Sequence, residues 1–141
     1  MGVSHAKEKL FEYIDREDQT KVAKVLDKYP AIINEPFSNG NPLNCPIRAA
    51  WRGDKEMMKF LFTRGANFNN SVNGGYNPLM WTAIKGHFKA MKWLIEKAGV
   101  ETDICDSEGF TPLDNAIVHA NYECAIYLKK KVSGFFDFLV T

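Results

Sequence analysis

The side chains in this chain that suit covalent or metal chemistry are three cysteines and three histidines: Cys45, Cys105, Cys124, His5, His87 and His119. A cysteine nucleophile requires a histidine base within hydrogen-bond reach, and none of these histidines lies in a recognisable nucleophile motif. A zinc site requires ligands in closely spaced pairs, and no two of these residues have that spacing. The pattern therefore predicts no catalytic residue, no metal and no cofactor.

A glycine pair and a single cysteine lead to the same expectation. Gly74-Gly75 lacks the following Lys and Ser or Thr with which a P-loop holds a phosphate, and the nearby Pro78 favours a turn before a helix. Cys124 falls on the apolar face of an expected helix and is most simply a small buried hydrophobe. Isolated motif fragments are usually structural, so we expect a protein that is not an enzyme. The alternative is a regulatory domain or fragment of an enzyme whose catalytic part lies elsewhere.

The organisation of the chain follows from an internal repeat. Gly53, Gly86 and Ala120 hold equivalent places, 33 and then 34 residues apart. Mostly small residues lie three and four positions before these places, and leucines lie eight positions after them: Ala49-Ala50, Thr82-Ala83, Ala116-Ile117, Leu61, Leu94 and Leu128. A period of about 33 residues, with a turn and two helices per copy, predicts a solenoid whose units bury their apolar faces only by stacking.

The last copy opens on the pattern D-x-x-G-x-T-P-L, matched at every defined position by Asp106, Gly109, Thr111, Pro112 and Leu113. The middle copy departs from this pattern at Val72 and Asn77 and keeps its other marks: Gly75, Pro78, Leu79, Ala83, Gly86 and His87. The copy before it has Cys45 and Pro46 where Pro and Leu belong, but its end is well matched: Ala49, Ala50, Gly53, Leu61, Gly65 and Ala66.

With these motifs the chain resembles the ankyrin-repeat family over most of residues 8–131. The resemblance implies an all-α solenoid of helix-turn-helix repeats joined by short hairpin-like turns, and it implies a protein-binding role. The expected organisation is an N-terminal capping helical pair in 1–37, then repeats in 38–71 (with a degenerate start), 72–105 and 106–132. Residues 133–141 are predicted to be an apolar C-terminal tail, which we expect to fold back over the last helical pair as an improvised cap. The alternatives are that this tail docks on a partner or begins another repeat.

Local signals predict where individual helices begin and end. Thr111 can cap the helix that Pro112 opens, because the missing N–H of proline is not needed in a first helical turn. Gly65 and Gly99 fall where a left-handed residue commonly ends a helix. The second helix of each pair has apolar residues at helical spacing, at Val22, Val25, Leu26, Met58, Leu61, Phe62, Met91, Leu94, Ile95, Ala125 and Leu128.

Stacking of the family's kind implies that two places in each copy face a concave groove. The first row of groove residues is Leu43, Tyr76 and Phe110, in the turns before the inner helices. The second row is Trp51, Arg52, Ile84, Lys85, Val118 and His119, near the ends of those helices. Both rows are unusually apolar for positions that meet water, and contiguous apolar patches usually mark interfaces. The alternative is that these side chains pack on their neighbours and extend the core.

We expect Tyr76, Phe110 and Trp51 to anchor a bound protein, and Arg52, Lys85 and Glu108 to border the groove. Trp81 and Trp93 are expected to be buried between repeats. The partner is another protein, held either transiently by an adaptor or permanently within a multi-subunit complex. The sequence leaves that choice open.

Composition limits the remaining classes of function. The 141 residues have a net charge of +1, with 18 basic and 17 acidic side chains, so no basic excess favours nucleic acid. Lys129, Lys130 and Lys131 are best explained as cations at a helix C-terminus. No apolar run approaches the ~20 residues that span a membrane, and three unclustered cysteines favour a reducing compartment. We therefore expect a cytoplasmic protein without membrane insertion.

Overall fold

The computed structural model describes residues 2–140, except for the side chains of residue 73 and residues 133–140. The described residues form eight α-helices and two short 3-10 helices: α1 (Val3–Asp15), α2 (Gln19–Lys28), η1 (Pro30–Asn34), α3 (Cys45–Arg52), α4 (Lys55–Thr63), η2 (Asn73–Gly75), α5 (Pro78–Lys85), α6 (Phe88–Glu96), α7 (Pro112–Val118) and α8 (Tyr122–Val140). Two isolated β-bridges, Ser38 with Asn41 and Val72 with Tyr76, lie in the loops between helical pairs. The all-α class predicted from the repeat is confirmed.

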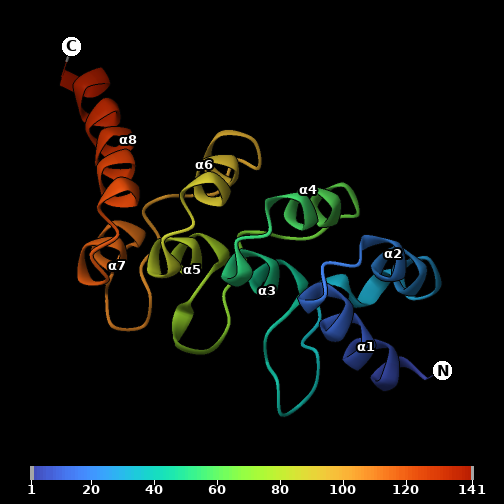
Figure 1. The fold of residues 1–141 in the computed structure, drawn as a ribbon. Helices are drawn as coiled ribbons and strands as arrows, with labels where there is room; N and C mark the ends of the chain where they lie inside the picture. Colours follow the sequence, from blue (N-terminus) through green and yellow to red (C-terminus); the bar gives the residue numbers. More distant parts are fainter. Residues whose placement is uncertain (1, 141) are drawn as a thin grey trace.

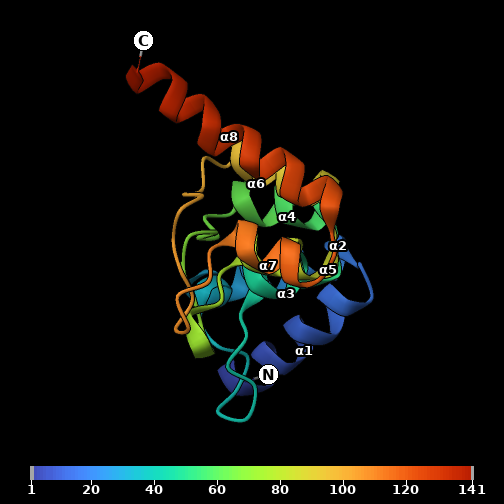
Figure 2. The same cartoon turned by 90° about the vertical axis from the view of Figure 1, so that its left-hand side faces the viewer.

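The helices form two layers that run the length of the molecule (Figure 1). An inner layer contains α1, α3, α5 and α7, and an outer layer contains α2, α4, α6 and α8. The loops between pairs project from the inner layer, away from the outer one. Figure 2 views this stack from the end formed by α7 and α8, with each pair behind the next. The arrangement is the predicted solenoid; the division into segments 38–71, 72–105 and 106–132 stays a prediction.

Polar side chains start the inner helices of the three repeats in the same way. Asn44, Asn77 and Thr111 are the N-caps of α3, α5 and α7, and each side-chain oxygen accepts a hydrogen bond from a backbone N–H three residues on, at 2.9–3.1 Å. Thr111 also belongs to a capping box with Asp114. The asparagines that replace the expected threonine therefore keep its role, because both side chains supply the acceptor that a helix N-terminus lacks.

A left-handed residue follows every inner helix of the described chain. Glu17, Gly53, Gly86 and Ala120 have φ values of +57°, +70°, +75° and +57°. This conformation turns the chain sharply from the inner helix into the outer one. At Gly53 and Gly86 an added Cβ would also meet a side chain of the next pair, at 2.5 Å from the ring of His87 and 2.8 Å from Asn121.

The side chains that approach these glycines join successive pairs. Nε2 of His87 donates to the backbone carbonyl oxygen of Trp51 over 2.9 Å. Nδ2 of Asn121 donates to the carbonyl oxygens of Ala83 and Ile84 over 2.7 and 2.8 Å. The last carbonyls of an α-helix have no partner within the helix, so the α5–α6 pair satisfies the end of α3 and the α7–α8 pair satisfies the end of α5.

Apolar contacts complete the stack. Small residues on α3, α5 and α7 are fully buried and let neighbouring helices approach closely: Ala49, Ala50, Thr82, Ala83 and Ala116. The apolar positions predicted on the outer helices are buried with two exceptions, Ile95, which is half-buried, and Phe62, which is 43% exposed. Trp93 is buried, as predicted, with its ring edge-on to Phe62 and Phe68 at 5.5 and 5.6 Å.

The C-terminal helix is longer than the other outer helices. Its backbone continues to Val140 as part of α8, and Figure 2 shows it running past the rest of the stack. Lys129, Lys130 and Lys131 therefore lie within the helix, and their predicted place at a helix C-terminus is wrong. The expected packing of the 133–141 side chains over the last pair lies outside the described residues. Among the described residues, no helix is both long enough and apolar enough to span a membrane.

Replacing Gly53 by alanine is expected to lower the free energy of unfolding by at least about 1 kcal/mol, because a left-handed Cβ costs about 1–2 kcal/mol and this one also displaces His87. Thermal unfolding followed by circular dichroism measures the effect. The reciprocal change Ala120→Gly is the matched control and should raise the midpoint, because it removes the same strain where Ala120 already has a φ of +57°. A Gly53→Ala protein as stable as the parent would contradict this role of the turn.

Candidate partner-binding site

The loop before α7 is held in shape by one carboxylate. Oδ1 of Asp106 accepts hydrogen bonds from the backbone N–H groups of Glu108 and Phe110 over 2.9 and 3.0 Å. Oδ2 accepts from the side-chain amide of Asn115 over 3.4 Å. Burial opposes ionisation, but these hydrogen bonds outweigh it, so the pKa of Asp106 lies below its ordinary value of 3.8. The loop therefore presents Phe110 in a fixed position.

The loop before α5 and the loop before α7 are joined directly to each other. The backbone N–H of Ser107 donates to the carbonyl oxygen of Gly74 over 2.8 Å. A Cβ on Gly75, whose φ is +79°, would lie 3.0 Å from the backbone nitrogen of Ser107. Only glycine permits this approach at that φ. The loops that carry Tyr76 and Phe110 are thus held side by side.

The first predicted row of groove residues differs in exposure along the stack. Leu43 is half-buried and packs against the hydrophobic core. Tyr76 is half-buried, with its ring centre 5.3 Å from that of Trp81. Phe110 is 41% exposed. The row is therefore most exposed at Phe110, in the third repeat.

The second predicted row is organised around Trp51. Its half-buried ring lies between two cations, the guanidinium of Arg48 at 4.2 Å and the ammonium group of Lys85 at 4.4 Å from the ring centre. A cation over an aromatic face is attracted by the ring quadrupole. Trp51 and Lys85 are both residues that the sequence assigns to the groove. Arg48 also contacts this ring, but the sequence does not predict it as a groove residue.

Arg52 belongs to an ionic cluster at the N-terminal end of the row. Its guanidinium lies 4.0 Å from Asp15 and 3.5 Å from Glu17, while Arg48 forms a two-point contact with Asp15 at 2.7 and 2.9 Å. Nε of Arg52 is buried without a hydrogen-bond partner. Arg52 is therefore ion-paired with residues of the same chain. These ion pairs hold α3 against the first helical pair.

The C-terminal part of the second row is more open. Ile84 is half-buried, whereas Lys85 and His119 are exposed and Val118 is 68% exposed. Nδ1 of His119 is hydrogen-bonded to the carbonyl oxygen of Asn115 over 2.9 Å, which closes the end of α7. Val118 thus lies on a fixed helix end, exposed like Phe110 in the loop before the same helix.

Trp81 is the residue at this site whose surroundings sequence reasoning missed. It is half-buried instead of fully buried, its ring lies beside Tyr76, and its indole N–H is buried without an acceptor. An unpaired buried donor costs free energy, and because this N–H is buried a partner on the surface does not reach it. The helical position of Trp81 next to the small pair Thr82-Ala83 suggested burial, and only the hairpin geometry reveals the contact with Tyr76.

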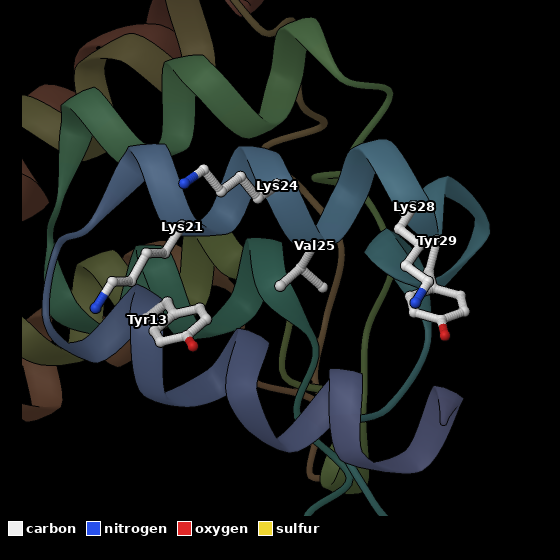
Figure 3. A pocket seen from close by; sticks show the side chains of 6 residues that line it. All are labelled: Tyr13, Lys21, Lys24, Val25, Lys28 and Tyr29. Carbon is white, nitrogen blue, oxygen red and sulfur yellow. The ribbon is translucent and has the colours of Figure 1, made fainter. Parts of the chain in front are cut away.

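A separate cleft of about 290 Å³ lies on the N-terminal pair. Figure 3 shows Tyr13 of α1 and Val25 of α2 beside it, with Lys21, Lys24, Lys28 and Tyr29 around them. The ammonium groups of Lys21 and Lys28 lie over the rings of Tyr13 and Tyr29, each at 5.4 Å. The sequence analysis missed this cleft because its residues come from the pair that matches the repeat only by apolar spacing.

The reactive residue types do not converge on a site in the described part of the chain. No group of three His, Cys, Asp or Glu side chains there could hold a metal ion. Burial raises the pKa of the Cys45 and Cys124 thiols, and Glu123 raises that of Cys124 further. Cys124 is buried, as its helical position predicted. Both thiols are kept protonated, which suits packing and opposes nucleophilic chemistry.

Residues 47–136 match a protein-family model described as ankyrin repeats in three copies. Alpha-latrocrustotoxin-Lt1a of Latrodectus tredecimguttatus is 29% identical over 111 residues, which are 78% of this chain and 8% of that protein. Ankyrin repeat and SAM domain-containing protein 6 of Mus musculus is 37% identical over 78 residues, 54% of this chain and 9% of that protein. Ankyrin repeat protein nuc-2 of Neurospora crassa is 23% identical over 108 residues, 77% and 10% of the two chains. The chain spans a tenth or less of each relative.

Replacing Asp106 by asparagine is expected to lower the thermal midpoint at neutral pH. Because the pKa of Asp106 is lowered by folding, its contribution to stability is fully present above 3.8 and is lost as the pH falls through the lower folded-state pKa. The difference between the parent and Asp106→Asn should therefore shrink on acidification, which melting curves measured from neutral pH downwards would detect. Asp103→Asn, at an exposed position in the same loop, is the control. A difference that stayed constant with pH would contradict the assignment.

Proposed function

The chain belongs to the ankyrin-repeat family, whose repeats are generally protein–protein interaction modules, and we propose that it binds one partner protein through its inner face. In this proposal the partner lies across the hairpin loops and the ends of α5 and α7. The contact surface consists of Tyr76, Phe110, Trp51, Ile84 and Val118, with Lys85 and His119 at its edge. Leu43 and Arg52, also predicted there, have mainly a supporting role.

One observation carries the proposal. Phe110 and Val118 are apolar and 41% and 68% exposed, and hydrogen bonds order the backbone that carries them, in the Asp106 network and at the end of α7. A backbone that is already ordered loses little additional entropy on binding. Phe110 and Val118 therefore favour an interface more strongly than an exposed side chain on a mobile loop would.

Trp51 and Trp81 support the same surface in different ways. The Trp51 ring is held by Arg48 and Lys85, which fixes an amphipathic aromatic group of the kind that dominates binding energy at interfaces. The Trp81 ring lies 5.3 Å from that of Tyr76, which restricts the position of the Tyr76 side chain at the surface. An inner face about three repeats long offers about 800 Å² of contact, a standard interface size.

The finer role in this proposal is a permanent subunit of a larger assembly, because obligate interfaces are more apolar than transient ones and this surface exposes Phe110 and Val118. The three cysteines are free, which favours a reducing compartment such as the cytoplasm. A purified chain that co-purifies stoichiometrically with its partner would support this role. A chain that releases the partner on dilution would support a transient adaptor instead.

Phe110→Ala and Val118→Ala are each expected to weaken partner binding by about tenfold or more, as truncation of an interface anchor does, while leaving the thermal midpoint almost unchanged because both side chains are exposed. The partner is captured from cell extract on the immobilised parent chain and identified by mass spectrometry, and its affinity is then measured by calorimetry.

Tyr122→Ala is the matched control for these substitutions. Tyr122 is 65% exposed but lies on outer helix α8, so its removal should not change the affinity. Equal affinities of all three variants would contradict binding at the inner face. A large loss of stability in Phe110→Ala would instead assign that ring to the core.

A further inference from the structure

The outer layer carries a groove of about 800 Å³ that the inner-face proposal does not use. It is lined by residues of α4, α6 and α8 and by the residue that follows α6, namely Lys55, Lys59, Phe88, Lys89, Lys92, Trp93, Glu96, Lys97 and Glu123. A smaller hollow of about 360 Å³ shares Phe88, Lys89 and Glu123 with it and reaches Gly53 and His87. The two form one continuous depression beside α6.

The charge of this groove is not compensated by the surrounding residues. Five lysines line it, against two glutamates, although the whole chain has a net charge of only +1. Lys59 lies 3.6 Å from Glu56. In the described part of the chain, Lys55, Lys89, Lys92 and Lys97 have no carboxylate within ion-pair distance. A concentration of one sign of charge in a groove attracts ligands of the other sign.

One of the two glutamates is already engaged. Oε1 of Glu96 accepts a hydrogen bond from the hydroxyl group of Tyr127 over 2.8 Å. Burial, together with this hydrogen bond, raises the pKa of Tyr127 to about 12. The contact directs Glu96 towards α8 and leaves the lysines of α6 to face a ligand. On the inner face, by contrast, Arg48 and Arg52 are paired with carboxylates.

The floor of the groove is apolar but offers no open aromatic face on which a nucleotide base could stack. Trp93 is only 7% exposed, and the ring of Phe88 packs edge-on against that of Tyr127 at 5.5 Å. The lining has no arginine, the residue that best matches phosphate with two parallel hydrogen bonds. Nucleic acid is therefore a poor fit, whereas carboxylates spaced by apolar side chains match both the lysines and the floor.

We propose that this groove binds an acidic segment of a protein in which glutamate or aspartate residues alternate with apolar ones. Adjacent packed helices lie about 10 Å apart, so a groove over three helices is about 20 Å across, which an extended segment of about six residues spans. The site lies on the outer layer, so it is independent of the inner face, and a partner could occupy both or either.

The test measures binding of the whole chain to a fluorescein-labelled peptide of about ten alternating glutamate and leucine residues, a length that covers the groove with a margin at each end. Fluorescence anisotropy should give saturable binding that weakens as salt is raised from low to physiological ionic strength, where charges are screened beyond about 8 Å. The same peptide with glutamine in place of glutamate should not bind.

The double variant Lys89→Glu/Lys92→Glu should lose affinity by about tenfold or more, as charge reversal at a complementary interface does, with no change in melting temperature because both side chains are exposed. The matched control Lys21→Glu/Lys24→Glu makes the same change of net charge at the N-terminal cleft and should bind as the parent does. Phe110→Ala should also bind the peptide normally, which separates this site from the inner face.

Three results would overturn the proposal. The first is equal binding of the glutamine peptide, and the second is an equal loss of affinity in both double variants, which would indicate only a general charge effect. The third is tighter binding of single-stranded RNA or phosphatidylserine vesicles than of the acidic peptide in the same assay.

Discussion

Each helical pair in this chain can bury its apolar face only against another pair, and the turn between its two helices is where that contact is most restricted. Gly53 and Gly86 take a left-handed φ and at the same time admit a side chain of the next pair, His87 or Asn121. Those side chains bond the carbonyl groups at the end of the preceding inner helix. The same few atoms thus end a helix, reverse the chain and set the register between repeats.

That register determines what the two faces of the stack display. On the inner side it places the loops of Tyr76 and Phe110 next to each other, with a backbone hydrogen bond between Ser107 and Gly74. It also places Lys85 over the ring of Trp51 from the preceding repeat. On the outer side it brings lysines of α4 and α6 into one groove. One face is apolar and the other is positively charged, so the two suit chemically different ligands.

The features that the sequence predicted best are local ones. The cap by Thr111, the left-handed Gly65 and Gly99, the close packing of Ala49, Ala83 and Ala116 and the burial of Trp93 depend on neighbouring residues or on the period itself. The exposure of the groove residues was harder to predict, because it depends on contacts between repeats. Leu43 packs on the core and Trp81 is half-buried beside Tyr76. The lysine groove was missed because its members are dispersed along the sequence and gather only when α4 and α6 pack together.

The central claim is that the repeat stack holds a partner protein against its apolar inner face. Photo-crosslinking tests it most directly, with a benzophenone-bearing phenylalanine in place of Phe110 or, in a second protein, of Phe62. The two rings are 41% and 43% exposed, but Phe110 lies in an inner loop and Phe62 on outer helix α4. We expect irradiation of the complex to link the partner to position 110, whether or not position 62 is linked as well. Linkage at position 62 alone would contradict the account.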